Sequence, residues 1–161
     1  MAARLNSRPH YRCIVLALPP SAIALLESGA NAHLITINRD GSPQLSLVWP
    51  GVEGDEIVVA HLRFHQKLRN VERDSRVVLS VEGPSLNPVT GLRDYLVVHG
   101  RARVTEGGAP MLLARLAPRF LGPDPAFPAA DAPAGWVLRI TPERLGGSGP
   151  WMIDVAASGP T

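Results

Sequence analysis

Basic side chains stand at every second position of one ten-residue segment, HLRFHQKLRN, which spans residues 61–70. They are His61, Arg63, His65, Lys67 and Arg69. If the chain stays extended, this alternation places all five on one side of a strand. If the chain turns into a helix near Gln66, they gather at the helix start, where free backbone N–H groups favour anions. Either geometry predicts a binding place for negative charge.

Holding a phosphate is the chemistry that this segment could perform. Three donor-rich side chains and free backbone N–H groups could converge on one anion. Each charge-assisted hydrogen bond contributes about 1.5–3 kcal/mol, so two or three would anchor a phosphorylated cofactor. The alternative interpretation is a solvated, charged connector between a strand and a helix, in which surface charges contribute little.

Other catalytic and binding patterns are weak or missing in the sequence. There is no G-x-G-x-x-G dinucleotide fingerprint and no Walker A motif. The run GGSGP resembles a nucleophile elbow only loosely, because a proline replaces the second flanking glycine. His61 and His65 could share a metal on a helix, but Arg63 and Lys67 would crowd the cation and no Cys or carboxylate completes the set. We therefore expect no metal.

Length and composition bound the class of protein. The chain of 161 residues is long enough for one core, and 45% hydrophobic with 19% charged residues is typical of a globular domain. A net charge of +2 gives no reason to expect a nucleic-acid partner. Cys13 is the single cysteine and is interpreted as a buried, inert thiol in a reducing compartment. The apolar run CIVLAL is too short for a signal peptide or membrane span, so we expect a cytoplasmic protein without a membrane partner.

The elements that must position the basic segment are mostly strands. We expect an N-terminal arm over residues 1–18 and one domain over 19–161, beginning with a short helix from Pro19 to Gly29. Strands are predicted within residues 32–50, where Asp40–Gly41 forms a hairpin turn, and over 56–62, 76–83, 94–106 and 136–145.

Helices and loops complete the predicted order. A helix is predicted over residues 65–74 and another from residue 109 to near Pro118, while Gly100 marks a bend or bulge. A Pro- and Ala-rich loop spans residues 122–135 and could cover a pocket. Trp49 and Trp151 could both stack on a flat substrate, but Trp49 is interpreted as a core residue, whereas Trp151 in the Gly-rich tail is less easily assigned to the core. This order predicts a mainly β (α+β) fold, a small antiparallel barrel with helices at its ends.

Three segments, DGSPQLSLVW, QKLRNVERDSRV and YLVVHGRA, together resemble the flavin and deazaflavin oxidoreductases of the split β-barrel fold. More narrowly, they resemble the pyridoxamine-phosphate-oxidase-like enzymes that use coenzyme F420. The resemblance covers about residues 20–105 and, more weakly, the final strand. It implies a split antiparallel β-barrel with short flanking helices, and a homodimer with the cofactor in a groove between subunits.

The resemblance also implies an activity. It is that of an F420H2-dependent reductase, which transfers hydride from the deazaflavin to an electron-poor small molecule. The alternatives are an FMN-dependent oxidase or reductase of the same fold and a non-catalytic F420 or flavin carrier.

The resemblance implies three groups of cofactor-binding residues. The phosphate would be held by Ala60, His61, Arg63, His65, Gln66, Lys67 and Asn70. The ring would lie against the strand that carries Pro43, Gln44, Ser46 and Val48. A further edge, from the partner subunit, would be formed by Arg93, Asp94 and Tyr95. Tyr95 is also the candidate catalytic residue, as a proton donor, from its position alone.

Two positions depart from the family pattern. His65 stands where many relatives carry Arg, and a neutral imidazole donates one hydrogen bond rather than a bidentate pair. Ala60 stands where Ser or Thr is common, so one hydroxyl contact is lost. Arg69 and Arg73 could meet the acidic tail of F420, or they could form a solvated helix face.

Overall fold

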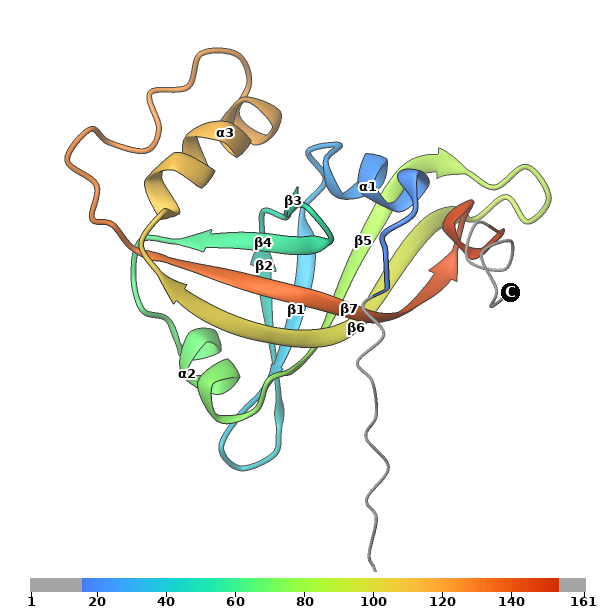
Figure 1. Cartoon of the computed structure of the whole chain (residues 1–161). Helices are drawn as coiled ribbons and strands as arrows, with labels where there is room; N and C mark the ends of the chain where they lie inside the picture. The colour runs from blue at the N-terminus through green and yellow to red at the C-terminus, as the bar shows by residue number, and fades with distance from the viewer. Residues whose placement is uncertain (1–15, 154–161) are drawn as a thin grey trace, which may run out of the picture.

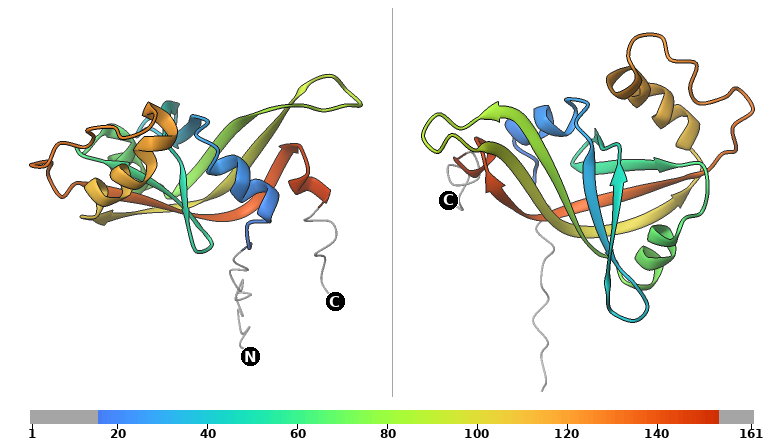
Figure 2. Two further views of the ribbon diagram at one scale, coloured as in Figure 1. Left: turned by 90° about the horizontal axis from the view of Figure 1, so that it is seen from above. Right: turned by 180° about the vertical axis from the view of Figure 1, so that it is seen from behind.

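The computed structural model describes residues 16–153 and consists of one curled antiparallel sheet with helices around it (Figures 1 and 2). The strands are β1 (Ala32–Ile37), β2 (Pro43–Val48), β3 (Gly51–Glu53), β4 (Glu56–His61), β5 (Arg76–Leu86), β6 (Arg93–Glu106) and β7 (Trp136–Ser148). The helices are α1 (Pro20–Leu26), α2 (Gln66–Arg73) and α3 (Ala109–Leu121). The predicted mainly β fold with short flanking helices is confirmed.

The strand order explains why the barrel is split. The seven strands follow the order β2-β1-β5-β6-β7-β4-β3, and every pairing is antiparallel. Strands β2 and β3 are consecutive in the chain, yet they form the two edges of the sheet and are not hydrogen-bonded to each other. The sheet therefore curls almost into a barrel without closing.

A tight turn sets the register of the β1–β2 hairpin. The Asp40 carboxylate accepts hydrogen bonds from the backbone N–H and the hydroxyl of Ser42, and the Gly41 N–H donates to the Asn38 carbonyl at 3.0 Å. Gly41 has a φ of 85°, a conformation that favours glycine. The hairpin predicted from Asp40–Gly41 is confirmed.

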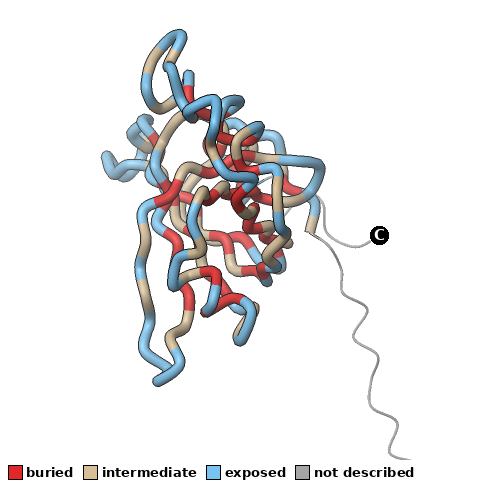
Figure 3. Tube along the Cα trace, turned by 90° about the vertical axis from the view of Figure 1, so that its left-hand side faces the viewer, coloured by how far each residue is buried: buried red, intermediate tan, exposed pale blue. Residues whose placement is uncertain are grey.

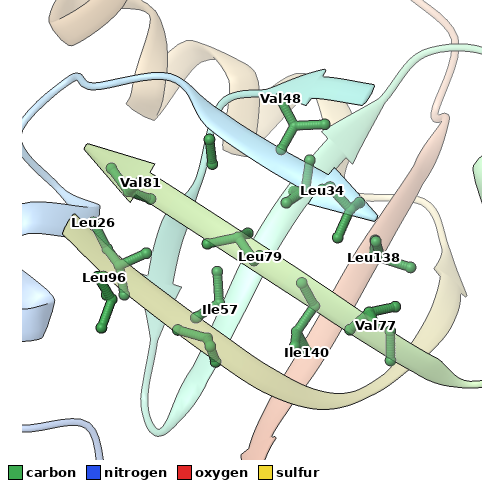
Figure 4. Close-up of a cluster of buried hydrophobic side chains, with 14 of the residues drawn as sticks. Leu26, Leu34, Val48, Ile57, Val77, Leu79, Val81, Leu96, Leu138 and Ile140 are labelled. Atoms are coloured by element: carbon green, nitrogen blue, oxygen red, sulfur yellow. The ribbon is translucent and has the colours of Figure 1, made fainter. Parts of the chain in front are cut away.

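The core lies inside the curl of the sheet. Figure 4 shows side chains of β1, β4, β5, β6 and β7 that point into one space, among them Leu34, Ile57, Leu79, Leu96 and Ile140, and all five are fully buried. In Figure 3 the buried segments run through the middle of the molecule while the hairpin tips are exposed. Burial of such side chains is the main stabilising term of the fold.

The predicted irregularity at Gly100 is confirmed. The β6–β7 register shifts between His99 and Gly100, so β6 bends there. A Cβ atom at residue 100 would clash with the carbonyl oxygen of Thr141. This close approach explains the glycine.

Two helix and strand ends differ from the prediction. Helix α3 continues through Pro118 to Leu121, because Leu116 and Ala117 are fully buried and hold its last turn on the sheet. Strand β7 extends to Ser148, through residues that the sequence analysis assigned to the tail. None of the helices within residues 16–153 is long and apolar enough to cross a membrane.

The interpretation of Trp151 is wrong, and Trp151 is the more deeply buried of the two tryptophans. Trp151 is 3% exposed, belongs to the core and donates its indole N–H to the Gly146 carbonyl at 3.2 Å. Trp49 is only half-buried and follows β2 at the edge of the sheet. Trp49 therefore keeps part of its ring accessible while it packs against the buried cluster of Val58, Leu112, Leu116 and Val137.

Candidate cofactor site

The start of helix α2 decides between the two geometries of the basic segment. The helix begins at Gln66, and His65 precedes it in an extended conformation with φ −82° and ψ 166°. No side chain caps this helix start and its first turn carries no acidic residue. Its first backbone N–H groups therefore face the surroundings with the partial positive charge of the helix dipole uncompensated.

The helix also breaks up the row of basic residues. His61 is buried at the end of β4, and Lys67 is half-buried, whereas Arg63, His65 and Arg69 are exposed. The Arg69 guanidinium lies 5.7 Å from the centre of the Phe64 ring, on the outer side of the helix. Of the two geometries, the structure has the helical one, because the chain turns helical after His65 and the five side chains do not share one strand face.

His61 and Lys67 line a cavity of about 230 Å³. Its other walls come from the end of β2, from Val59 and Ala60 on β4, from Leu113 on α3, and from Phe127 in the loop after α3. In Figure 1, α3 and that loop stand on one side of the end of β4 and α2 stands on the other. The cavity thus has a polar side near α2 and an apolar side near α3.

His61 is neutral, so it is not one of the cations that could bind a phosphate. It is 7% exposed, and its Nε2 atom is buried without a hydrogen-bond partner among the described residues. Burial lowers the pKa of its imidazole to about 3, helped by the charges of Lys67 and His65. At neutral pH the buried nitrogen is therefore a polar atom that only a ligand or solvent can satisfy.

Among residues 16–153, Lys67 is the one cation that lines the cavity. It is the only lysine of the 161 residues and takes part in none of the ion pairs found within residues 16–153. Burial lowers the pKa of its ammonium group, and no carboxylate opposes this effect. His65 is exposed beside it, with a pKa lowered by partial burial and by the charges of Lys67 and Arg63. A bound anion would stabilise the charged form of Lys67.

Asn70 holds the helix in place rather than facing the cavity. Its fully buried side-chain NH₂ donates to oxygen atoms of Thr36, Asn38 and Gln44 at 2.9–3.0 Å. Its carbonyl oxygen accepts from Gln66 at 3.0 Å and from an arginine of the same helix at 3.1 Å. Because both ends of this amide are occupied, Asn70 positions α2 against the β1–β2 hairpin, and Gln44 and Gln66 belong to the same network.

The β2 residues of the prediction lie on two faces. Gln44, Ser46 and Val48 pair with Thr36, Leu34 and Ala32, and all three of these partners face the interior. Val48 is 5% exposed and lines the cavity, while Pro43 is exposed on the opposite face. Because side chains alternate along a strand, Pro43 points away from the barrel. The other three predicted residues of β2, Gln44, Ser46 and Val48, share the face toward the barrel.

The third group lies far from the cavity within one chain. Along the β6–β7 ladder, Tyr95 pairs with Ser148, whereas Glu106 pairs with Trp136, which in turn pairs with His61. From Tyr95 to Glu106 the strand covers roughly 35 Å. Tyr95 is 46% exposed, so its side chain is available to another molecule.

The neighbours of Tyr95 have local partners. Arg93 donates to the Pro84 carbonyl at 2.9 Å and lies 3.4 Å from the Glu82 carboxylate. Asp94 has one carboxylate oxygen buried without a hydrogen-bond partner among the described residues, at the opposite end of the sheet. Of the first two predicted groups, the structure therefore brings Val48, Ala60, His61 and Lys67 together around one cavity, and it leaves the third group apart.

Sequence reasoning missed the aromatic side of the cavity. Trp49 stacks on Phe120 with ring centres 4.7 Å apart and planes at 7°, and the ring of Phe127 meets Trp49 edge-on at 5.8 Å. The spacing of Leu113, Leu116 and Phe120 on one helix face could have indicated part of this wall. Phe127 lies in the loop 122–135, which was expected to be able to cover a pocket, but the loop has no periodicity that would single out this residue.

Comparisons with known proteins support the expected fold. A scan against family models and a comparison with curated protein sequences gave no match. The solved structure of an F420 reductase has a TM-score of 0.62 at 27% identity, and the match covers 76% of this chain and 94% of that one. Conserved hypothetical protein Rv2991 from Mycobacterium tuberculosis has a TM-score of 0.61 at 27% identity, covering 78% and 80%.

A third structure extends the comparison at lower identity. A Listeria innocua protein assigned as a pyridoxamine 5'-phosphate oxidase has a TM-score of 0.56 at 21% identity, covering 77% of this chain and 92% of that one. At this identity the match shows the fold alone. Together the three structures confirm the resemblance on which the sequence analysis relied. Within residues 16–153, no three His, Cys, Asp or Glu side chains are placed to hold a metal ion.

Proposed function

We propose that this chain, which resembles the pyridoxamine-phosphate-oxidase-like split barrels, is a reductase that uses coenzyme F420 to reduce an electron-poor small molecule. The single observation that carries the proposal is Lys67, an unpaired and half-buried cation beside the uncapped start of α2. The similarity to an F420 reductase at 27% identity favours the deazaflavin over FMN.

The residues at the start of α2 suit the phosphate of such a cofactor. The ammonium of Lys67, the imidazole of His65 and the first N–H groups of α2 would donate to the phosphate. Val48 and Val59 would border the adjoining space with apolar surface and exclude water from it. When bound, the deazaflavin supplies the hydride, while these residues bind it and orient it.

We further propose that the active protein is a homodimer. The cavity of about 230 Å³ is smaller than the roughly 300–1,000 Å³ of typical ligand pockets, so one chain encloses only part of a ligand. Leu45 and Leu47 on β2 are 61% and 59% exposed, which leaves apolar surface for a second copy to cover. A second copy would also bring its own Tyr95 to the site, which a single chain cannot do.

Binding of F420 to the Lys67→Ala variant tests the proposal. Loss of one charge-assisted contact is expected to weaken binding roughly ten- to a hundredfold, with the melting temperature unchanged. Arg39→Ala removes one positive charge from the exposed hairpin turn and serves as the matched control, with unchanged affinity. Equal affinity of the Lys67→Ala variant and the wild type for F420 would refute the role of Lys67 in binding the phosphate.

Two further measurements separate the alternatives. Clear preference for FMN over F420 would overturn the choice of cofactor but would leave the phosphate-binding role of Lys67 intact. Failure of bound F420H2 to be oxidised by any enone in a single turnover would favour a carrier protein. Mixing Lys67→Ala and Tyr95→Phe subunits tests the dimer, because a mixed dimer has one intact site and should regain activity.

A further inference from the structure

A second cavity lies far from Lys67, at the end of the sheet where β6 begins and α1 packs (Figure 1). Its volume is about 240 Å³, and α1, β5, β6 and the segment after β7 all contribute to its lining. The described side chains that line it are apolar or carry a hydroxyl group, except for Asp94, which is the single charged one among them. It shares no lining residue with the cavity beside Lys67.

Strand alternation turns Asp94 toward the inner face of the sheet. Leu96 and Val98 on that face of β6 are fully buried, and Asp94 continues their row, while Tyr95 faces the other way. Gly83 lies beside Asp94 on the neighbouring strand, where a Cβ atom at residue 83 would lie 3.7 Å from the Cβ of Asp94. Because Gly83 has no side chain, space remains next to the carboxylate.

The Asp94 carboxylate has no hydrogen bond and no ion pair within residues 16–153. The adjacent Arg93 does not reach it, since its guanidinium donates to the Pro84 carbonyl and lies beside Glu82. Oδ1 of Asp94 is buried, whereas the residue as a whole is half-buried and lines the cavity, so Oδ2 is the oxygen that a ligand can meet. A carboxylate in such surroundings is unfavourable without a cation.

We propose that this cavity binds an organic cation with an apolar stem. The charged nitrogen group donates to Oδ2 of Asp94. The stem contacts Ala24, Pro84 and Pro150, which line the cavity and are exposed, so their apolar surface is available to a ligand. This inference goes beyond the proposed function and does not depend on it, because the cofactor would bind at the other end of the sheet.

A free amine and an arginine of this chain are two sources of such a cation. Residues 1–15 contain Arg4, Arg8 and Arg12, and they precede α1, which contributes to the cavity. Both sources present a charged donor group on an apolar stem. Replacing the three arginines by alanine in the full chain distinguishes them.

The experiment is an NMR titration with benzylamine and with benzyl alcohol, which have nearly the same shape and differ in charge. The indole N–H signal of Trp151, which lines the cavity, reports binding at this place. Benzylamine is expected to bind at least about fivefold more tightly than benzyl alcohol, since only its ammonium group makes a charge-assisted contact. Asp94→Asn keeps the shape of the side chain and should abolish this preference. Glu82→Gln removes an exposed carboxylate from the neighbouring strand and serves as the matched control, with the preference unchanged.

Repeating the titration with the variant that lacks Arg4, Arg8 and Arg12 assigns the source. Tighter binding of benzylamine than to the wild type identifies an arginine of residues 1–15 as the occupant, and equal binding with the preference retained identifies a free amine. If neither protein prefers benzylamine, or if the preference persists in Asp94→Asn, the proposal is wrong. Neither F420 nor FMN enters the measurement, so its outcome is separate from that of the proposed function.

Discussion

Because His61 is buried and neutral in the folded protein, the free energy of unfolding is expected to decrease as the pH falls. Its folded pKa of about 3 lies below the value of 6.5 for an unburied histidine, so the unfolded chain binds a proton that the folded chain excludes. Stability from this residue is complete above the unfolded pKa and is lost as the pH falls through 6.5 toward 3. Between pH 7 and pH 5 the proton uptake of the unfolded state alone removes about 2 kcal/mol of unfolding free energy.

Urea unfolding of the wild type and of the His61→Gln variant measures this loss. Glutamine remains polar but does not titrate, so the variant lacks the dependence on this site. The other four histidines are present in both proteins, and their contribution cancels in the difference. The wild type is expected to lose about 2 kcal/mol more than the variant between pH 7 and pH 5, with an unchanged m-value.

A constant difference between the two proteins, within about 0.5 kcal/mol over this range, would refute the reasoning. It would mean that water or a counter-charge reaches the imidazole in the folded state. A histidine ring signal that stays in its neutral position down to about pH 4 in an NMR titration would support the burial directly. The same titration must distinguish His61 from His65 and His99, because partial burial lowers the pKa of those two imidazoles as well.

Three other predictions follow from the described contacts. Asn70→Asp replaces the NH₂ donor that faces three oxygen acceptors by a carboxylate oxygen, and it should destabilise the fold by at least about 3 kcal/mol in urea unfolding, with Asn70→Ala costing less. Gly100→Ala places a Cβ against the Thr141 carbonyl and should cost about 1–3 kcal/mol, whereas Gly146→Ala, whose Cβ would meet its nearest atoms at 3.9 and 4.0 Å, should show no such clash. Because Lys67 is the only lysine, acetic anhydride labels only it and the terminal amine, and saturating cofactor should slow its labelling at least about fivefold in peptide mass spectra. Unchanged stability of the Asn70 or Gly100 variants would count against the contacts described for those residues. A labelling rate of Lys67 that does not change with cofactor would count against its role in cofactor binding.

The sheet could be predicted from the sequence because its determinants are local. Asp40–Gly41 favours one hairpin turn, and alternation of apolar and polar residues identifies the strands on either side. Helix α2 could also be predicted, since the helical spacing of Leu68 and Val71 begins after Gln66. These features depend on residues that are close in the chain.

The features that the sequence did not reveal depend on contacts between distant segments. Trp49 packs against a buried cluster, as its interpretation as core implies, but it follows the alternation of Leu45 and Leu47 toward an exposed face and keeps part of its ring accessible. Trp151 follows a Gly-rich run that pointed to a tail, but the run continues β7 and returns the indole to the core. The neutral charge state of His61 also depends on the walls around it, which no spacing of residues reveals.

The charged residues differ in whether a partner of opposite charge lies beside them in the fold. Arg103, Arg115 and Arg139 each lie against a glutamate carboxylate, in ion pairs that join β3, β4, β6, β7 and α3. Such pairs leave little net field outside the protein, which is why the net charge of +2 says little about partners. Lys67 differs because it is half-buried and has no carboxylate partner within residues 16–153. An unpaired cation with an uncapped helix start on one side and a neutral imidazole on the other is unfavourable in a protein without a ligand. An anion bound at the start of α2 would offset this local cost.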